Sequence, residues 1–531
     1  MRSWVVCISF FTFWILFRTF SLAQSLVSLG DSELVYAPYA NVGQSDRINV
    51  IPDFSRAGYA GGGVKIPFVR TVITLRPRSG DCTGLIQDAI DALASRPLDA
   101  SGFRGAVLLK KGVYRLDGEI AIKADGIVLR GEGDGVDGTV LVATKKKKHN
   151  SITLAGKAGK DLLVTSSIRR ITSEFVPTGA RDFTVEYDHD FEVGDSVIIE
   201  KTPSDKWITD LGMAQYGWSA KDYTMRYERI IEEVVGNKII INIPVVDPIE
   251  EQYGGAMVYR SSIRGRISQC GVENLRIESS FEHNEDEDHG WNAVVLARAK
   301  NCWVKNVVAK YFGYACVNIQ SMSVFNTVQD CAMVDPKSVT TGGRKYSFNI
   351  SHGSMGNLIQ RCVAWGGRHD FVTGSRVPGP NVFLDCVAEN SFADIGPHHR
   401  WSTGVLFDNI YGGQIRVQDR KAMGSGHGWA GAQTLFWNCR SVKKDIKVES
   451  PLGAMNWGIG CVGIEQKGDG YWESWGMHVN PRSLYLKQLE EREGRQAVFN
   501  VTTSAQRDGA IWDSLKERAT EIVNESRAFA P

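Results

Sequence analysis

A short motif recurs through the middle of the chain at steps that are typical of a solenoid. It consists of Asn or a small residue, two apolar residues, a variable residue, a polar residue and then Cys or an aliphatic residue. Successive copies end 24 to 31 residues apart, at Val307, Cys331, Cys362, Cys386, Ile410 and Cys439. Repetition at this period predicts stacked units that bury their apolar faces only against their neighbours. Short apolar runs separated by Gly, Asn and Asp indicate strands within each unit.

One turn of a parallel β-helix fits such a unit. We therefore predict an all-β fold, a right-handed parallel β-helix (solenoid), with its main coils and active-site face in residues 263–465. Like residues on successive coils should form columns, so Cys331, Cys362 and Cys386 should point into the core together. Adjacent rungs lie about 5 Å apart, which leaves disulfides possible by distance, but we favour free buried thiols.

Residues 80–95 have the pattern of a helix that covers the open end of the coils. Ile86, Ala89, Ile90 and Leu93 recur at helical spacing in GDCTGLIQDAIDALAS. This helix, followed by GVYRL, IVLRGEG and GTVL, resembles the start of the pectate-lyase-like β-helix superfamily. The resemblance covers residues 45–155 and 266–465. It implies the fold and leaves the reaction open, because lyases, hydrolases, esterases and phage adhesins share this fold.

The chain divides into five predicted segments. They are a signal peptide (1–23), an amino-terminal cap with the first coils (24–159), an inserted antiparallel β subdomain (160–262), the main β-helix (263–465) and a partly helical carboxy-terminal extension (466–531). The first segment has Arg2, an apolar stretch at residues 4–16 and Ser-Leu-Ala before residue 24. We expect a secreted or periplasmic protein, with an uncleaved anchor as the alternative; sequencing the mature amino terminus tests this.

Charge argues against a nucleic-acid partner. The formal net charge is +1, and loss of Arg2 and Arg18 with the signal peptide brings it to −1. No overall basic excess exists for binding phosphates. We expect no membrane association after signal cleavage, and the sequence does not indicate an oligomeric state.

Candidate catalytic residues gather in three glycine-rich strings, at residues 366–374, 396–404 and 424–431. Seven of the ten His lie between residues 283 and 427. The predicted catalytic residues are Arg368, His369, His398, His399, Arg400 and His427. The repeat register places Arg344 level with Arg368, and His398 level with His427. Stacked like charges repel unless an anion lies between them, so we expect an anionic polysaccharide as the partner.

A second set of residues is predicted to bind substrate. It comprises His289, Arg344, Lys345, Asp370, Trp401, Arg420 and Trp429. No zinc-ligand spacing appears, and no cofactor is indicated with certainty. The acidic run at residues 285–288 is typical of a solvated turn, although it could bind Ca²⁺.

Three functions remain open. A lyase would need Arg to neutralise a uronate carboxylate and His, Lys or Tyr as a base, and the cluster is rich in these types. A glycoside hydrolase would need two carboxylates, with Asp370 and Asp394 as candidates and Asp408 and Asp419 further away. GHG at residues 426–428 is similar to the polygalacturonase family, whose N-T-D, D-D and R-I-K elements are absent. A non-catalytic binder would stack sugars on Trp401 and Trp429. We favour the lyase.

Overall fold

The structure is a computed structural model that describes residues 25–157, 159 and 162–525. The predicted signal peptide lies outside the described residues. Within the described part of the chain, no helix is both long enough and apolar enough to cross a membrane.

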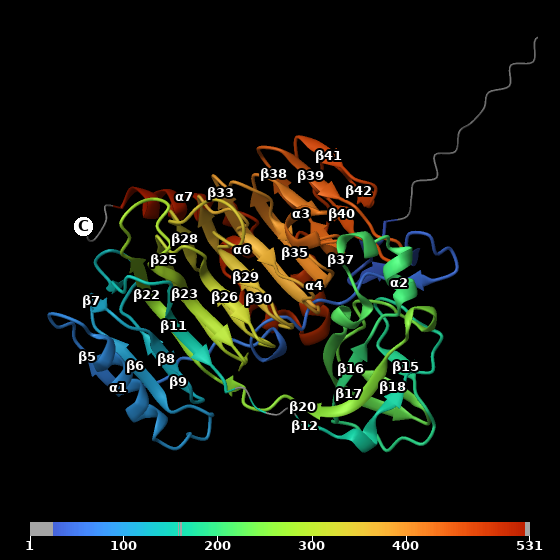
Figure 1. The fold of residues 1–531 in the computed structure, drawn as a ribbon, viewed down its shortest axis with the longest axis horizontal. Helices are drawn as coiled ribbons and strands as arrows, with labels where there is room; N and C mark the ends of the chain where they lie inside the picture. The colour runs from blue at the N-terminus through green and yellow to red at the C-terminus, as the bar shows by residue number, and fades with distance from the viewer. Residues whose placement is uncertain (1–24, 158, 160–161, 526–531) are drawn as a thin grey trace, which may run out of the picture.

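Parallel strands stack into coils around one long core (Figure 1). One sheet has 17 strands and includes β5 (Thr71–Leu75) at its start and β42 (Tyr471–Glu473) at its end; a second has seven, from β8 (Ile120–Ile122) to β34 (Gly396–Pro397). A third sheet of three strands begins with β36 (Ile415–Val417). The predicted right-handed parallel β-helix, with its capping helix, inserted subdomain and partly helical extension, is confirmed.

The residues that end the sequence motif form a single internal column. All six are fully buried in the same core: Val307, Cys331, Cys362, Cys386, Ile410 and Cys439. In the ladder between β33 (Asn381–Glu389) and β35 (Ser402–Gly412), Cys386 pairs directly with Ile410. The nine described cysteines are all buried and free, which confirms the prediction of free thiols.

Two stacks of phenylalanine rings lie in the same core, one on the seven-stranded sheet and one on the 17-stranded sheet. Ring centroids are 5.4 Å apart for Phe348 and Phe371, and 4.9 Å apart for Phe383 and Phe407. Phe407 also lies 5.2 Å from Phe436 on the following coil. Within each sheet, neighbouring coils therefore supply a large ring at the same position, and each stack ties those coils together.

The predicted capping helix is α1 (Thr83–Ala94). It lies at the amino-terminal end of the coils and packs on β6 (Gly105–Leu109), β8 and β9 (Ile127–Arg130) (Figure 1). Its buried residues are the four at helical spacing, Ile86, Ala89, Ile90 and Leu93. The helix thus removes from water the core that the first coil would otherwise expose.

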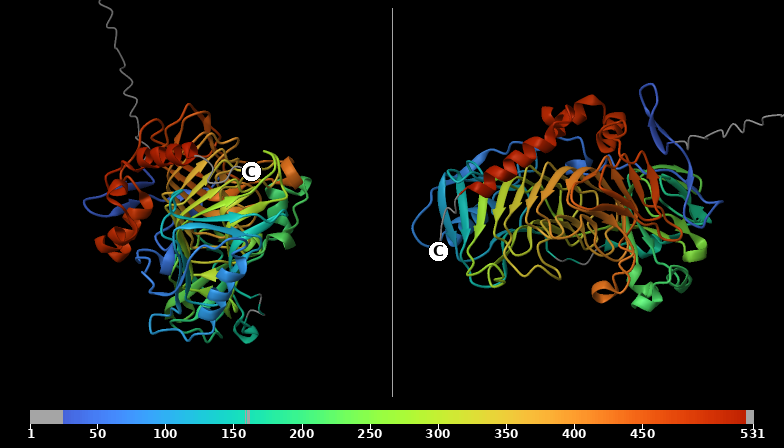
Figure 2. Two further views of the ribbon diagram at one scale, coloured as in Figure 1. Left: turned by 90° about the vertical axis from the view of Figure 1, so that its left-hand side faces the viewer. Right: turned by 90° about the horizontal axis from the view of Figure 1, so that it is seen from above.

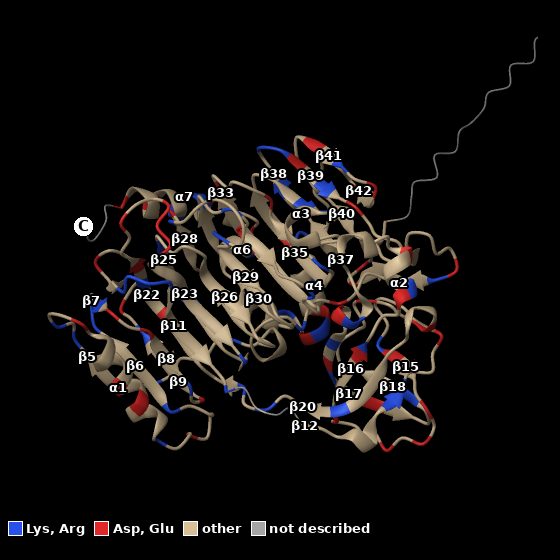
Figure 3. Cartoon of the chain, viewed as in Figure 1, with Lys and Arg blue, Asp and Glu red and all other residues tan. Residues whose placement is uncertain are grey.

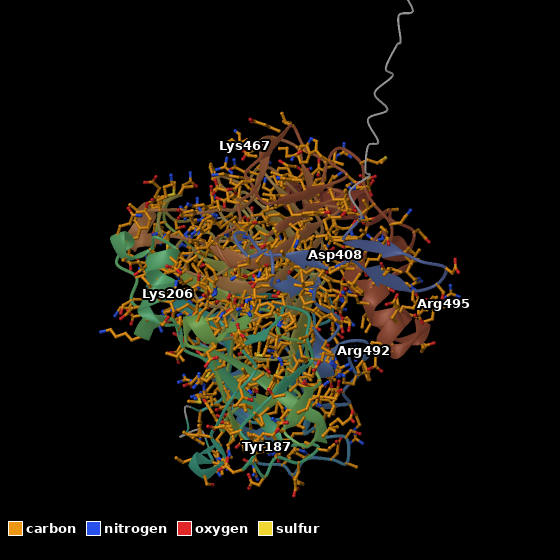
Figure 4. All side chains as sticks on the ribbon, turned by 90° about the vertical axis from the view of Figure 1, so that its right-hand side faces the viewer. Tyr187, Lys206, Asp408, Lys467, Arg492 and Arg495 are labelled. Carbon is orange, nitrogen blue, oxygen red and sulfur yellow. The ribbon has the colours of Figure 1, made fainter. Side chains whose placement is uncertain are left out.

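The inserted subdomain projects from the coils without breaking their stack. Its antiparallel sheet runs from β12 (Leu162–Leu163) to β20 (Met257–Ser262) and has its own apolar core. On either side of it, β11 (His149–Ala155) pairs in parallel with β23 (Gly290–Ala297). Tyr187, labelled in Figure 4, lies at the far end of the subdomain.

The amino-terminal segment differs from the prediction. Residues 25–58 do not join the first coils but lie against later ones, where Leu26 and Phe54 share a core with Leu484 and Leu489. The cause is the apolar outer face of the large sheet, which needs a cover. The backbone NH of Gly58 donates to the carbonyl oxygen of Gly356 (2.8 Å), anchoring this segment beside the middle coils.

The carboxy-terminal extension packs outside the coils (Figure 2). It includes α4 (Leu484–Glu493), α5 (Arg495–Val501), α6 (Ser504–Arg507) and α7 (Ile511–Asn524). Parallel pairing continues past the predicted boundary at residue 465, because β42 pairs with β40 (Trp457–Ile459). Asp408, labelled in Figure 4, accepts hydrogen bonds at the start of α4 and so joins the extension to the coils.

Replacement of Phe407 by Ala should destabilise the protein by about 3–5 kcal/mol, because a stacked and fully buried ring leaves a cavity. Urea unfolding measures this change. Ile464→Ala is the matched control, since this side chain is 68% exposed and its loss should cost within about 0.5 kcal/mol. Equal stability of the two variants would contradict the stacked core.

Candidate active site

Four histidine rings from successive coils lie against one another. The ring centroids of His369 and His398 are 4.4 Å apart, and those of His398 and His427 are 5.1 Å apart. His399 lies 5.2 Å from His398 and 4.8 Å from His427. We call these four residues the histidine cluster.

The strand register brings the cluster together. His398 and His399 directly follow β34, which pairs with β32 (Phe371–Thr373), and β32 begins two residues after His369. Ser402 pairs with Gly431 in the ladder between β35 and β37 (Gly431–Trp437), an offset of 29 residues (431 − 402). His398 and His427 are separated by the same offset (427 − 398). These two rings are therefore level, as the sequence repeat indicates.

The cluster contains buried nitrogen atoms that have no hydrogen-bond partner among the described residues. Each of its rings has one buried nitrogen without a hydrogen-bond partner among the described residues: Nε2 of His369 and Nδ1 of His398, His399 and His427. The Nε atoms of Arg400 and Arg420 share this condition. Buried polar atoms normally have partners, so six such nitrogens in one place indicate a site for a polar ligand.

Asp394 orients one side of the cluster. Its carbonyl oxygen lies 2.7 Å from Nδ1 of His369, and its carboxylate accepts a hydrogen bond from Arg420. A proton on Nδ1 of His369 would leave Nε2 as the acceptor in the neutral ring. Burial raises the pKa of Asp394, but Arg420, His369 and the hydrogen bonds to its carboxylate together outweigh burial and hold that pKa below its usual value.

The histidines are neutral near pH 7. Burial is the main cause that lowers the pKa of His369 to about 4, of His399 to about 3 and of His427 to about 4. Burial also holds the pKa of His398 far below its usual value. Neighbouring guanidiniums lower these pKa values further, notably Arg420, which acts on all four rings. Neutral imidazoles can accept protons, which is what a general base must do.

A cavity of about 670 Å³ opens beside the cluster, between the coils and the inserted subdomain. We call it the groove. His399 and Tyr346 line it, and the Tyr346 ring also lies 5.2 Å from His369 and 5.3 Å from His398. The groove is therefore continuous with the cluster through these two residues.

The floor and the opposite wall of the groove are polar. On the floor, Nδ2 of Asn349 donates to Oδ1 of Asn318 (2.9 Å), while Oδ1 of Asn349 is buried without a partner among the described residues. The opposite wall belongs to the inserted subdomain and includes Arg226 and Tyr259. Amides, hydroxyls and aromatic rings together suit a hydroxyl-rich ligand.

The charges around the groove favour an anion. Arg376 lines it, with Nε donating to Oγ of Ser375 (3.0 Å), and lowers the pKa of His399. Glu228, an acid in the same wall, is paired with Arg266. Figure 3 shows the middle coil strands largely uncharged, whereas the inserted sheet carries both signs. Arg376, which has no ion pair among the described residues, thus lies where His399 meets the groove.

The six predicted catalytic residues all lie in or beside the cluster. Arg400 donates through Nη2 to the carbonyl oxygen (2.6 Å) and Oγ (2.8 Å) of Ser425. Arg368 donates to the carbonyl oxygen of Gly342 (2.6 Å) and lowers the pKa of both Tyr346 and His427. Arg420, predicted as a substrate-binding residue, joins them through Asp394.

Two predicted basic residues face elsewhere. Arg344 forms a two-armed ion pair with Glu287, at 2.6 and 3.0 Å. Lys345, not Arg344, is level with Arg368, because the backbone NH of Arg368 donates to the carbonyl oxygen of Lys345 (2.8 Å). The predicted stacking of Arg344 on Arg368 is therefore wrong by one residue, and Lys345 points into a different cavity.

Four further candidates have structural surroundings. Trp401 is buried against Trp207 (centroids 4.8 Å apart), so its ring cannot stack on a sugar; Trp429 is half-buried beside it. Asp370 is fully buried and accepts hydrogen bonds from two serines, Ser347 and Ser391. His289 uses both ring nitrogens, on Ser279 and on two carbonyl oxygens, which braces its loop.

The acidic run at residues 285–288 is held by protein groups. The carboxylate of Asp286 accepts backbone hydrogen bonds from Glu282 (2.9 Å) and Asp288 (2.8 Å), and Glu287 is paired with Arg344. Across the described part of the chain, no three His, Cys, Asp or Glu residues lie together in a way that could hold a metal ion. The backbone hydrogen bonds to Asp286 hold the run in a turn.

Arg376 escaped the sequence analysis as a functional candidate, although it lies two residues after the string at 366–374. Tyr346 was considered only as part of the lower-ranked string GGRKY (342–346), and Asp394 only as a hydrolase carboxylate. Proximity to the candidate string was the available signal for Arg376. The sequence left open whether the inserted subdomain flanks the cleft, and in the structure its residues line one wall of the groove.

Comparisons with known proteins show likeness in structure only. No family model and no curated protein sequence matches this chain. The tailspike protein gp49 from Pseudomonas phage LKA1 is 12% identical, over 74% of each chain, with a TM-score of 0.38. An alginate lyase from Paenibacillus sp. str. FPU-7 is 9% identical, over 77% of this chain and 99% of its own, with a TM-score of 0.36. Both scores are below 0.5, so the function has to be inferred from the residues of the cluster.

The neutral cluster should make stability depend on pH. In the unfolded chain a histidine has a pKa of about 6.5, so it becomes protonated at a pH where the buried histidines of the folded protein are still neutral. Between pH 6.5 and about 4 the unfolded state thus binds more protons, and the free energy of unfolding falls as the pH falls. We expect the melting temperature of the wild type to fall more between pH 7 and 5 than that of His398→Gln.

The comparison with a variant isolates the imidazoles. Burial raises the pKa of Asp370 to about 6 and that of Asp408 to about 7, which acts in the opposite direction in both proteins. His283→Gln, on an exposed loop, serves as the control and should follow the wild type. Parallel melting curves for wild type and His398→Gln across this pH range would mean that the cluster is not held neutral.

Proposed function

We propose that this protein is an enzyme that cleaves an anionic, uronate-containing polysaccharide by β-elimination. The observation that carries the proposal is a set of buried imidazole and guanidinium nitrogens where the cluster meets the groove, which have no hydrogen-bond partners in the described part of the chain. Removal of a proton beside a carboxylate requires a neutral base and a positive charge that neutralises the carboxylate. The imidazoles and the guanidiniums of the site are these two components.

The guanidiniums account for recognition of the acid. A uronate carboxylate placed near Arg376 and Arg400 would have its charge neutralised, which makes the adjacent proton on C5 more acidic. Because that negative charge grows in the transition state, the same contacts would stabilise the transition state more than the bound substrate. The groove also offers Asn349 and Tyr259 for sugar hydroxyls and rings.

His399 is the proposed base, because it is the member of the cluster that lines the groove. Its imidazole takes the proton from C5, the released electron pair forms the C4–C5 double bond, and the C4–O bond breaks. Tyr346 is the proposed donor of the proton that the leaving oxygen needs, and the protonated imidazole restores it. Burial raises the pKa of Tyr346, so its phenol carries a proton at neutral pH.

The carboxylates do not favour the hydrolase alternative. Hydrolysis needs two acids on either side of the scissile bond. Asp370 and Asp408 are fully buried, and Asp394 is paired with Arg420. Asp419 lies outside the cluster, with Oδ1 bound to the backbone NH of Lys421 (2.8 Å). A secreted or periplasmic location, inferred from residues 1–23, would place the enzyme where such polymers are met.

His399→Ala should lower kcat/KM by roughly 10²-fold or more, because the transition state loses its base. The measurement is ultraviolet absorbance of the unsaturated product during incubation with alginate, polygalacturonate and glycosaminoglycan uronates. His283→Ala is the matched control, since this histidine is exposed on a loop away from the groove. Tyr346→Phe should lower kcat with an unchanged melting temperature.

Three other outcomes of these assays would each reject part of the proposal. New reducing ends without ultraviolet absorbance would identify a hydrolase. Binding without cleavage of any polymer would identify a non-catalytic carbohydrate-binding protein. Full activity of a folded His399→Ala protein on a cleaved substrate would exclude His399 as the base.

A further inference from the structure

A second cavity, of about 470 Å³, lies on the other side of the loop that ends at Tyr346. It is bounded by β28 (Ala332–Val334), the loop that follows it, and Val523 in α7. We call it the lysine pocket. Lys345 and Tyr346 are consecutive, yet Lys345 lines the lysine pocket while Tyr346 lines the groove. The two cavities are therefore separate but share one stretch of backbone.

Three lysines line the lysine pocket, and all are almost fully buried. Lys310 is 2% exposed, Lys345 7% and Lys337 8%. Lysine is rarely buried unless it is paired with an acid. Lys337 has such a partner, since its Nζ lies 2.7 Å from Oδ1 of Asp335. Nζ of Lys310 donates to the carbonyl oxygen of Ile522 (3.0 Å).

Lys345 makes its hydrogen bond to a neutral group. Its Nζ donates to the neutral hydroxyl of Thr340 (2.9 Å), and it forms no ion pair among the described residues. Burial and the charge of Lys337 lower its pKa by more than the carboxylates of Asp335 and Glu285 raise it. Three ammonium groups against the single carboxylate of Asp335 leave the lining with an excess of positive charge. An anion in the pocket would relieve this repulsion.

The rim of the pocket presents aromatic rings. Phe392 is 62% exposed, which is unusual for so large an apolar side chain, and Nζ of Lys345 lies 5.4 Å from the centre of its ring. Trp365 also lines the pocket and is half-buried. A cation beside exposed aromatic rings is suited to a ligand that has both an acidic group and a ring face.

We propose that the lysine pocket is a second binding site for an acidic sugar, in which Lys345 holds the carboxylate and Phe392 covers the ring. Only the identification of the ligand as a sugar rests on the proposed function; the excess positive charge does not. The site would hold a further stretch of the polymer, or a product, away from the histidine cluster.

The test uses glucuronate as the probe and ligand-observed saturation-transfer NMR to measure its affinity. The protein is the full chain carrying His399→Ala, so that the histidine cluster is altered in every sample. We expect glucuronate to bind, neutral glucose not to bind, and addition of Lys345→Gln to weaken glucuronate binding about tenfold or more through loss of a charge-assisted contact. Phe392→Ala should weaken it as well, and Lys444→Gln, an exposed lysine outside the pocket, should not.

Unchanged glucuronate affinity in a folded Lys345→Gln protein would overturn the site. Displacement of glucuronate by an equal concentration of inorganic sulfate would overturn the role of the ring and leave a simple anion site. In the otherwise wild-type enzyme, Lys345→Gln should raise KM for a long polymer by more than it lowers kcat. A loss of kcat as large as that of His399→Ala would place the pocket within the active site and so contradict a separate site. Absence of any cleavage would reject the proposed function while leaving the glucuronate result intact.

Discussion

Parallel pairing between successive coils is the constraint on which the rest of this structure depends. It converts a separation of 24 to 31 residues along the chain into neighbouring positions in space. Inside, the same pairing produces the columns of cysteine and phenylalanine. Outside, it places His369, His398 and His427 on adjacent coils. The core and the candidate active site are thus two faces of one repeat.

Burial beside arginine gives the cluster its chemistry. An exposed histidine would be partly protonated at mildly acidic pH, whereas these rings stay neutral because burial and neighbouring guanidiniums both oppose a second positive charge. The arrangement is costly for the empty protein and becomes favourable when an anion neutralises the arginines. Buried imidazoles held beside guanidiniums in this way are typical of a binding site rather than of a core.

Much of the fold could be predicted from the sequence because the repeat is local and regular. The column through Cys331 and Cys386 and the buried face of α1 follow from spacing alone, as does the level position of His398 and His427. Loop lengths were not predictable, so the register of Arg344 was wrong by one residue. The burial of Trp401 depends on where the inserted subdomain docks, and the path of residues 25–58 depends on the outer face of distant coils; neither is encoded nearby.

The central claim is that an anion binds against neutral imidazoles, and proton uptake on binding tests it most directly. Calorimetric titration with an oligouronate near pH 5, in buffers of different ionisation enthalpy, counts the protons taken up. Since the free His399 and His427 have pKa values of about 3 and 4, a bound carboxylate should raise them and draw in protons from solution. We expect measurable uptake that decreases in His399→Ala. Binding with no change in protonation, or with release of protons, would contradict the account.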